Sequence, residues 1–295
     1  MRARFGAPFA RASAAALALS CLATLITEMT GIAGAGSVFG VPGAASLVPA
    51  AALVAFAAAG GRARRLDALV VGIGLFEASF AAMAWLAHPD FSHWARTWQA
   101  VRLDDPRLVA MAAAIVGATF NPWMLFYQQH AVARARRRGE APAPAASRAE
   151  TALGALLGQG FTMSIVVIVA ATAHAAHRPL STLGELAAVF VGIAGPGLGY
   201  PLFAGGMLAS AFVAAVVCLE ALVAGSAELL PALRPAHTAW LGPLAIAASA
   251  LVACGFDDPV GSSVAVQAAS GLVSAGFIVV LFRLRANRAK AVRVA

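Results

Sequence analysis

The sequence contains few charged residues and few cysteines, and both shortages narrow the class of protein. Only 12% of the 295 residues are charged, whereas 61% are hydrophobic. This composition excludes a soluble domain of this size and predicts an all-α protein that crosses the membrane several times. The three cysteines, Cys21, Cys218 and Cys254, are scattered among apolar neighbours. Neither a disulfide framework nor a zinc site is therefore expected.

The net charge of +8 does not indicate a nucleic-acid partner, because the basic residues form short clusters at the ends of apolar runs. The lipid bilayer is the expected surrounding instead. We predict one transmembrane domain over residues 1–295, made of apolar runs near the length of about 20 residues that a membrane helix needs. The eight predicted spans are 13–36, 44–60, 67–87, 108–132, 151–174, 199–224, 238–254 and 260–282.

The loops between these spans alternate in charge. One set of loops and termini holds 17 of the 21 Lys and Arg residues, and the other set holds Arg96, Arg102, Arg107 and Arg178. The positive-inside rule places the richer set in the cytoplasm, so both termini are predicted to be cytoplasmic and the number of spans to be even. The richer set consists of Arg2, Arg4, Arg11, Arg62, Arg64, Arg65, Arg134, Arg136, Arg137, Arg138, Arg148, Arg234, Arg283, Arg285, Arg288, Lys290 and Arg293.

Three connecting segments carry further predictions. Residues 88–107 contain Trp94 and Trp98, which suit an interfacial segment on the outer surface. Residues 139–149 are rich in Pro and Ala and are predicted to be a flexible cytoplasmic linker. Residues 182–195 are predicted to form a short outer helix.

Residues 117–123, Gly-Ala-Thr-Phe-Asn-Pro-Trp, predict a helix break within an apolar span. Pro122 has no backbone N–H, so the carbonyl of Ala118 loses its helical partner, and Asn121 places an amide beside it. Such groups are tolerated at membrane depth where they face protein or a water-filled cavity, and transporters build midplane sites in this way. The alternative is a simple proline kink.

A few other polar residues fall inside predicted spans. Glu28 lies between Thr27 and Gly31, and it could carry a proton or could be a protonated acid bonded to a neighbouring helix. The second interpretation is favoured for Glu77 and Glu220. Gln267 could make a single interhelical hydrogen bond. The pair Gly154 and Gly158 has the spacing of a helix-packing motif.

Together these segments resemble the natural resistance-associated macrophage protein (Nramp) family of divalent metal transporters, in a divergent bacterial branch. Residues 115–130 resemble the sixth family helix, and residues 25–34 resemble the third. Arg62 to Leu66 resemble the basic turn before the fifth helix, and residues 266–269 a polar segment of the tenth. The resemblance implies a partial inverted-repeat bundle in the bacterial inner membrane.

Roles for individual residues follow from this resemblance. It implies that the Ala118 carbonyl, Asn121 and Gln267 are metal ligands, that Pro122 makes the helix break and that Glu28 belongs to a proton pathway. The family's methionine ligand is Asn121 here, which replaces a soft thioether by a hard amide oxygen. Trp123 stands for the motif histidine and Gly31 for the second acid of the third helix.

No segment resembles the first family helix with its Asp-Pro-Gly-Asn motif. The first two family helices are therefore expected to lie upstream of Met1, to come from another chain, or to be missing from a degenerate remnant. The predicted function is divalent metal cation transport, coupled to protons as the family implies. No bound cofactor and no enzymatic activity are expected. The alternatives are a non-transporting remnant or accessory subunit and, without a supporting motif, an organic-solute carrier.

The charge asymmetry gives a prediction of topology. Reporter fusions after Arg138 and after Arg293 should behave as cytoplasmic, and a fusion near Asp104 as periplasmic, because the basic loops stay inside. The measurement is paired alkaline phosphatase and fluorescent-protein activity in cells. A periplasmic signal from the fusion after Arg293 would contradict the even number of spans.

Overall fold

The computed structural model describes residues 2–59, 63–92, 101–140, 143–174, 180–230, 235–256, 258 and 260–276. All the regular secondary structure in this part of the chain is helical. The helices are α1 (Arg2–Val38), α2 (Gly43–Ala59), α3 (Ala63–Leu86), α5 (Pro106–Thr119), α6 (Pro122–Arg137), α7 (Pro144–Val169, continued by a π-helical turn Ala170–His174), α8 (Leu183–Ala194), α9 (Pro196–Leu229), α10 (Pro235–Cys254) and the helical segment 260–276.

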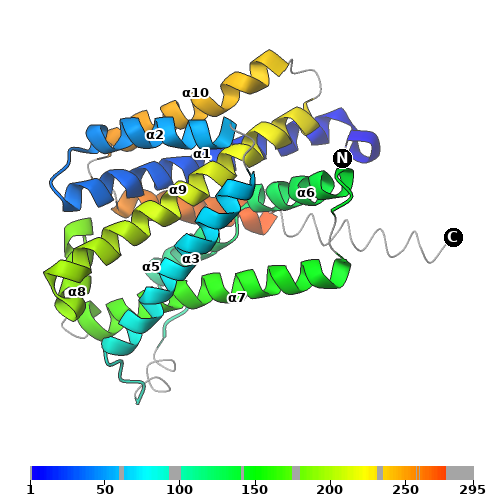
Figure 1. Ribbon diagram of the computed structural model, residues 1–295. Helices are drawn as coiled ribbons and strands as arrows, with labels where there is room; N and C mark the ends of the chain where they lie inside the picture. The colour runs from blue at the N-terminus through cyan, green and yellow to red at the C-terminus, as the bar shows by residue number, and fades with distance from the viewer. Residues whose placement is uncertain are drawn as a thin grey trace.

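Two long helices, α1 and α9, pack along each other and form the centre of the bundle (Figure 1). Their core includes Leu17, Cys21, Leu25, Cys218 and Leu219, all of which are at most 1% exposed. The two cysteines hold the helices close, since each thiol donates to the backbone carbonyl of the other residue, at 3.6 and 3.5 Å. Helices α2, α6 and α10 pack against this pair.

A second hydrophobic core joins α3, α8 and α9. Phe190 on α8 stacks between Phe80 on α3 and Phe203 on α9, with ring centroids 5.8 and 5.4 Å apart. These aromatic contacts anchor the short helix α8 to the two longer ones. The short helix predicted at 182–195 is present as α8, and its position on the outer side stays a prediction.

The all-helical, membrane-type fold predicted from the sequence is confirmed. Within the described residues, four helices have the length and apolar composition needed to cross a bilayer, namely Arg11–Val38, Pro106–Arg137, Pro144–Ala173 and Pro196–Ala227. The helices Gly43–Ala58, Phe76–Leu86, Leu183–Ala194 and Ala239–Cys254 are apolar but shorter. The number of spans therefore stays a prediction.

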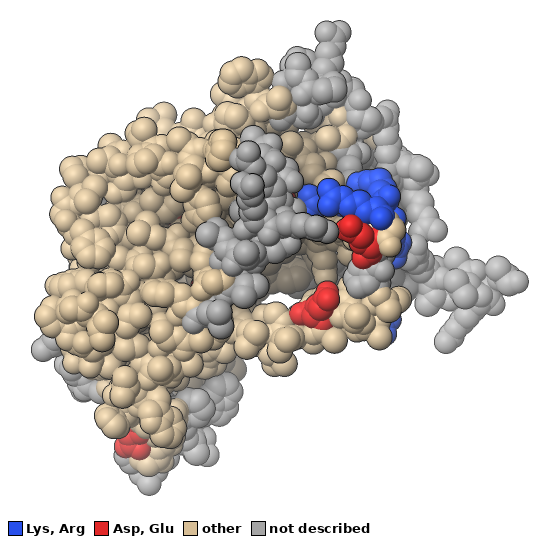
Figure 2. Space-filling view, viewed as in Figure 1, with Lys and Arg blue, Asp and Glu red and all other residues tan. Residues whose placement is uncertain are grey.

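On the face shown in Figure 2, charged side chains lie at the ends of the described surface. Lys, Arg, Asp and Glu lie near the end of α6 and the start of α7, a smaller acidic patch lies at the opposite end, and a wide uncharged region separates them. The last turn of α6 carries Arg134, Arg136 and Arg137. This separation of a charged end from an apolar middle is what a protein surrounded by lipid needs.

The predicted flexible linker at 139–149 is wrong over its second half. Helix α7 already begins at Pro144, seven residues before the predicted span. Proline is favoured at the first position of a helix, and the following Ala-Ala-Ser-Arg-Ala sequence consists mostly of good helix formers. The predicted interfacial segment at 88–107 lies partly outside the described residues, as do Arg62, Arg178 and Arg234.

A close backbone crossing joins α5 to the helical segment 260–276. A Cβ atom added at Gly117 would overlap the backbone carbonyl of Gln267, and one added at Gly271 would overlap the carbonyl of Ala113. Only glycine allows the two backbones to approach this closely. The break after α5 is therefore held against the segment that carries Gln267.

This crossing predicts a difference between two glycine substitutions. Gly117→Ala should destabilise the protein by about 1–3 kcal/mol, because the backbone atoms that it meets cannot rotate away. Gly154→Ala, on the open face of α7, should be neutral or should stabilise by up to about 1 kcal/mol, because a Cβ there meets nothing within 4 Å. Thermal unfolding in detergent measures both. Equal stability of the two variants would contradict the crossing.

Candidate functional site: a polar cavity beside the α5–α6 break

The predicted helix break is present and divides the predicted span 108–132 into two helices. Helix α5 ends at Thr119, α6 begins at Pro122, and both intervening residues have extended backbones. The break is held by side chains, since Asn121 Nδ2 donates to the Gly117 carbonyl at 2.5 Å and Ser274 Oγ donates to the Phe120 carbonyl at 2.6 Å. These bonds satisfy carbonyls that the interrupted helix would leave free.

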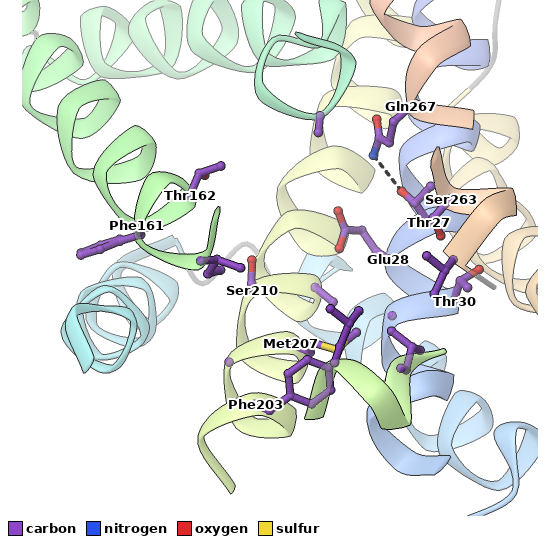
Figure 3. Close-up of a pocket in the computed structure, with 18 of the residues that line it drawn as sticks. Thr27, Glu28, Thr30, Phe161, Thr162, Phe203, Met207, Ser210, Ser263 and Gln267 are labelled. Atoms are coloured by element: carbon purple, nitrogen blue, oxygen red, sulfur yellow. Dashed lines mark hydrogen bonds between the residues drawn. The ribbon is translucent and has the colours of Figure 1, made fainter. Parts of the chain in front are cut away.

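A cavity of about 750 Å³ lies beside the break, between α1, α5, α7, α9 and the segment 260–276. It has the size of a small-molecule site, and most of its lining is apolar. Its polar groups come from different helices, and Figure 3 shows several of them around the open space. They are Thr27, Glu28, Thr30, Glu77, Thr162, Ser210, Ser263 and Gln267.

Three of the predicted site residues line this one cavity. Ala118 is in the last turn of α5, where its helical partner would be Pro122, which lacks an N–H. Glu28 extends from α1 into the open space, and Gln267 lies beside Thr27 (Figure 3). The structure therefore brings together groups that are up to 239 positions apart in the sequence, from Glu28 to Gln267.

The side-chain amide nitrogen of Gln267 is hydrogen-bonded, whereas its oxygen has no partner among the described residues. Its Nε2 donates to Thr27 Oγ1 at 3.2 Å, which is the interhelical hydrogen bond that the sequence analysis considered. Its Oε1 is buried and has no hydrogen-bond partner among the described residues. A buried acceptor without a donor is unfavourable, so this oxygen has free capacity to bind a cation or a donor from the cavity.

Asn121 and Pro122 support the cavity from behind and are not part of its lining. Both side chains are almost completely buried. Asn121 Oδ1 has no hydrogen-bond partner in the described part of the chain, while Nδ2 holds the break. Trp123, which stands at the position of the family histidine, donates from Nε1 to Thr24 Oγ1 at 2.9 Å and ties α6 to α1.

Glu77 also lines the cavity, which residue patterns alone did not indicate. Its carboxyl group is hydrogen-bonded to Ser210, so the interhelical bond favoured from the sequence exists between α3 and α9. Glu28 and Glu77 are the only charged residues in the described part of the lining. Among the described residues, no three His, Cys, Asp or Glu side chains cluster as a metal site. A metal bound here would need neutral oxygen ligands besides the two carboxylates.

The wall formed by α7 is unusually open. In the most apolar 18-residue stretch of α7, only 6% is buried inside the structure, compared with 44% in the corresponding stretch of α1. Gly154 and Gly158 were predicted to pack a neighbouring helix, but a Cβ atom at either meets nothing within 4 Å. That prediction is wrong for the contacts between described residues, because α7 touches mainly α3 and faces the cavity with its other side.

An apolar helical bundle with an interrupted helix and polar groups at membrane depth defines the class of multi-pass membrane transporters. Within that class the family is clear. Residues 1–292 match the sequence model of the Nramp family, described as natural resistance-associated macrophage protein-like, and the chain belongs to this family. Its members are transporters of divalent metal ions and not enzymes. A comparison with curated proteins finds no match for the chain.

Proposed function

We propose that the chain takes part in moving a divalent cation through the Glu28 cavity, the space of about 750 Å³ described above. The observation that supports this function best is that Glu28, Ala118 and Gln267 line one space beside a helix break, and that Gln267 Oε1 has no hydrogen-bond partner among the described residues. The ligands are the Ala118 carbonyl and Gln267 Oε1, with Asn121 Oδ1 joining them when the break opens towards the cavity.

Charge balance supports a divalent cation as the substrate. A divalent ion that leaves water needs strong electrostatic compensation, and Mg²⁺ in proteins is usually held by one or two carboxylates together with water. Glu28 and Glu77 are the two carboxylates among the described residues of the lining, and no Lys, Arg or His is among those residues. We infer that Glu28 releases a proton when the cation binds, so that proton movement and cation movement are coupled.

The oxygen ligands also favour hard cations. Carbonyl, amide and carboxylate oxygens suit Mg²⁺, Mn²⁺ and Ca²⁺, whereas thioethers suit softer metals. Met207 is the one thioether among the described residues that line the Glu28 cavity, and it lies on α9 beside Gly31. We therefore propose Mn²⁺ or Mg²⁺ as the substrate class.

A second proposal concerns the open wall of α7. We infer that a further apolar membrane helix, supplied by another chain, packs against α7 at Gly154 and Gly158 and closes the open side of the Glu28 cavity. Two observations support this docked helix. Only 6% of the most apolar stretch of α7 is buried, and a Cβ atom at Gly154 or Gly158 meets nothing within 4 Å. Close packing at small residues is how helices associate in lipid. The competing function, that of a non-transporting accessory subunit, predicts the same docking without cation flux.

One experiment separates these functions. Cells that lack their own manganese uptake and express this chain should take up Mn²⁺, and Glu28→Gln should reduce the rate at least tenfold because the neutral amide cannot balance the ion's charge. Liposomes that contain only the purified chain should show no saturable uptake. Glu150→Gln, an exposed carboxylate of α7 outside the cavity, is the matched control and should be unaffected.

Each outcome has a definite meaning. Uptake by both cells and liposomes would show that no partner chain is needed. No uptake in either would overturn the transport proposal and favour the accessory subunit. Equal losses in Glu28→Gln and Glu150→Gln would show that the effect arises from folding or expression and would remove Glu28 from the site.

The amide at the break gives a prediction of selectivity. Asn121→Met should move the preference of the cells from Mn²⁺ towards Cd²⁺ by about tenfold, because it places a thioether where an amide oxygen was available. The substitution also removes the bond to the Gly117 carbonyl, so a fall in total uptake is expected with it. Competition of Cd²⁺ against Mn²⁺ measures the ratio independently of the amount of protein. Met207→Leu is the control, and an unchanged ratio in Asn121→Met would exclude Asn121 as a ligand.

A further inference from the structure

A second cavity of about 630 Å³ lies where α1 and α10 end and where α2, α8 and the segment 260–276 begin. We call it the Asp258 vestibule. Asp258 is the only charged residue among its described lining, and Ser37, Ser181 and Thr182 add polar groups. Asp258 Oδ1 accepts from the backbone N–H of Gly261 at 2.9 Å, so the carboxylate also caps the helical segment. The space is negatively charged and contains hydroxyl groups, which suits a hydrated cation.

The vestibule and the Glu28 cavity are neighbours. Thr30, Leu183 and Val260 line both spaces, so these three residues form the boundary between them. Leu183 lies directly over Gly34, where an added Cβ atom would overlap Leu183 Cδ1. The absence of a side chain at Gly34 therefore lets Leu183 reach across to α1 and separate the two spaces.

The position of Leu183 is fixed by the start of α8. Thr182 Oγ1 accepts from the Glu185 N–H at 3.2 Å, and the Glu185 carboxylate accepts from the N–H groups of Ser181 and Thr182 at 2.6 and 2.9 Å. The Ser181 and Thr182 bonds hold the pKa of Glu185 below its usual range. This capping box fixes the first turn of α8, which begins with Leu183.

We propose that Leu183 is the hydrophobic constriction through which the Asp258 vestibule connects to the Glu28 cavity. An apolar side chain in a narrow passage excludes water and so blocks hydrated ions, while small displacements of the side chain or its helix open the way. The identity of the passing ion rests on the proposed function. The connection itself does not, because a reagent other than a metal ion can test it.

The test uses thiol accessibility in intact cells with a charged, membrane-impermeant methanethiosulfonate reagent. Native Cys254 lines the vestibule and should react rapidly, whereas Cys21 and Cys218 are completely buried and should not react. In a Cys254→Ser background, Ser263→Cys places a thiol in the Glu28 cavity but not in the vestibule, and it should react slowly. Adding Leu183→Ala should raise that rate at least tenfold.

Two further variants make the comparison specific. Leu186→Ala removes the same side chain one turn further along α8, where it lines the Glu28 cavity but not the vestibule, and should leave the Ser263→Cys rate unchanged. Leu183→Met conserves volume and should keep the rate low, which shows that substitution at this position does not unfold the chain. Elution of each variant as a single species in detergent checks folding.

The result that overturns the inference is an unchanged rate in Leu183→Ala, or an equal rise in Leu186→Ala. Reaction of Cys254 in inverted vesicles but not in intact cells would contradict the outer position predicted for α8, which lines the vestibule, and would move the same rate comparison to inverted vesicles. A rise confined to Leu183→Ala together with absent Mn²⁺ uptake would retain the connection and reject the proposed function. Mn²⁺ uptake together with an unchanged rate in Leu183→Ala would reject the constriction and retain the proposed function.

Discussion

The interruption between α5 and α6 is the constraint on which the rest of the site depends. A helix that ends in an apolar environment leaves carbonyl groups that no water can satisfy, so their partners must come from the protein. Here the partners are the Asn121 amide for Gly117 and the Ser274 hydroxyl for Phe120. The second bond requires the segment 260–276 to lie against the break. Gly117 and Gly271 permit that approach, and Gln267 is thereby placed at the cavity.

This arrangement shows the structural role of Asn121 and bears on the ligand role proposed for it. Its Nδ2 holds the break closed, whereas its Oδ1 is buried without a partner among the described residues. A methionine at this position could offer a cation its thioether sulfur but could not donate to the Gly117 carbonyl. The amide therefore stabilises an interrupted helix that a thioether would leave unsatisfied, and it presents a hard oxygen as well. The structural role and the proposed ligand role would thus both be met by an amide at this position.

The sequence predicted the parts of the fold that local chemistry determines. Pro122 located the helix break, the Thr182 to Gly195 segment located α8, and the apolar runs located the long helices. It did not predict that Glu77 shares a cavity with Glu28, because that requires α3 and α1 to meet around a space formed by α7 and α9. The Gly154 and Gly158 pair was misread for the same reason, since spacing shows that a helix can pack closely but not whether a neighbour is present.

The distribution of charge around the Glu28 cavity makes the final connection between fold and substrate. A single ionised carboxylate in an apolar bundle is costly, and two that share one space repel each other. Glu77 is hydrogen-bonded to the neutral side chain of Ser210. The described residues of the lining provide no basic side chain to balance either carboxylate. The space is therefore unfavourable when both acids are ionised and empty of cations. A proton on one acid, or a cation bound near them, reduces this repulsion. In the proposed function a doubly charged guest would supply that compensation, and the neutral oxygens of Ala118 and Gln267 would be its further ligands.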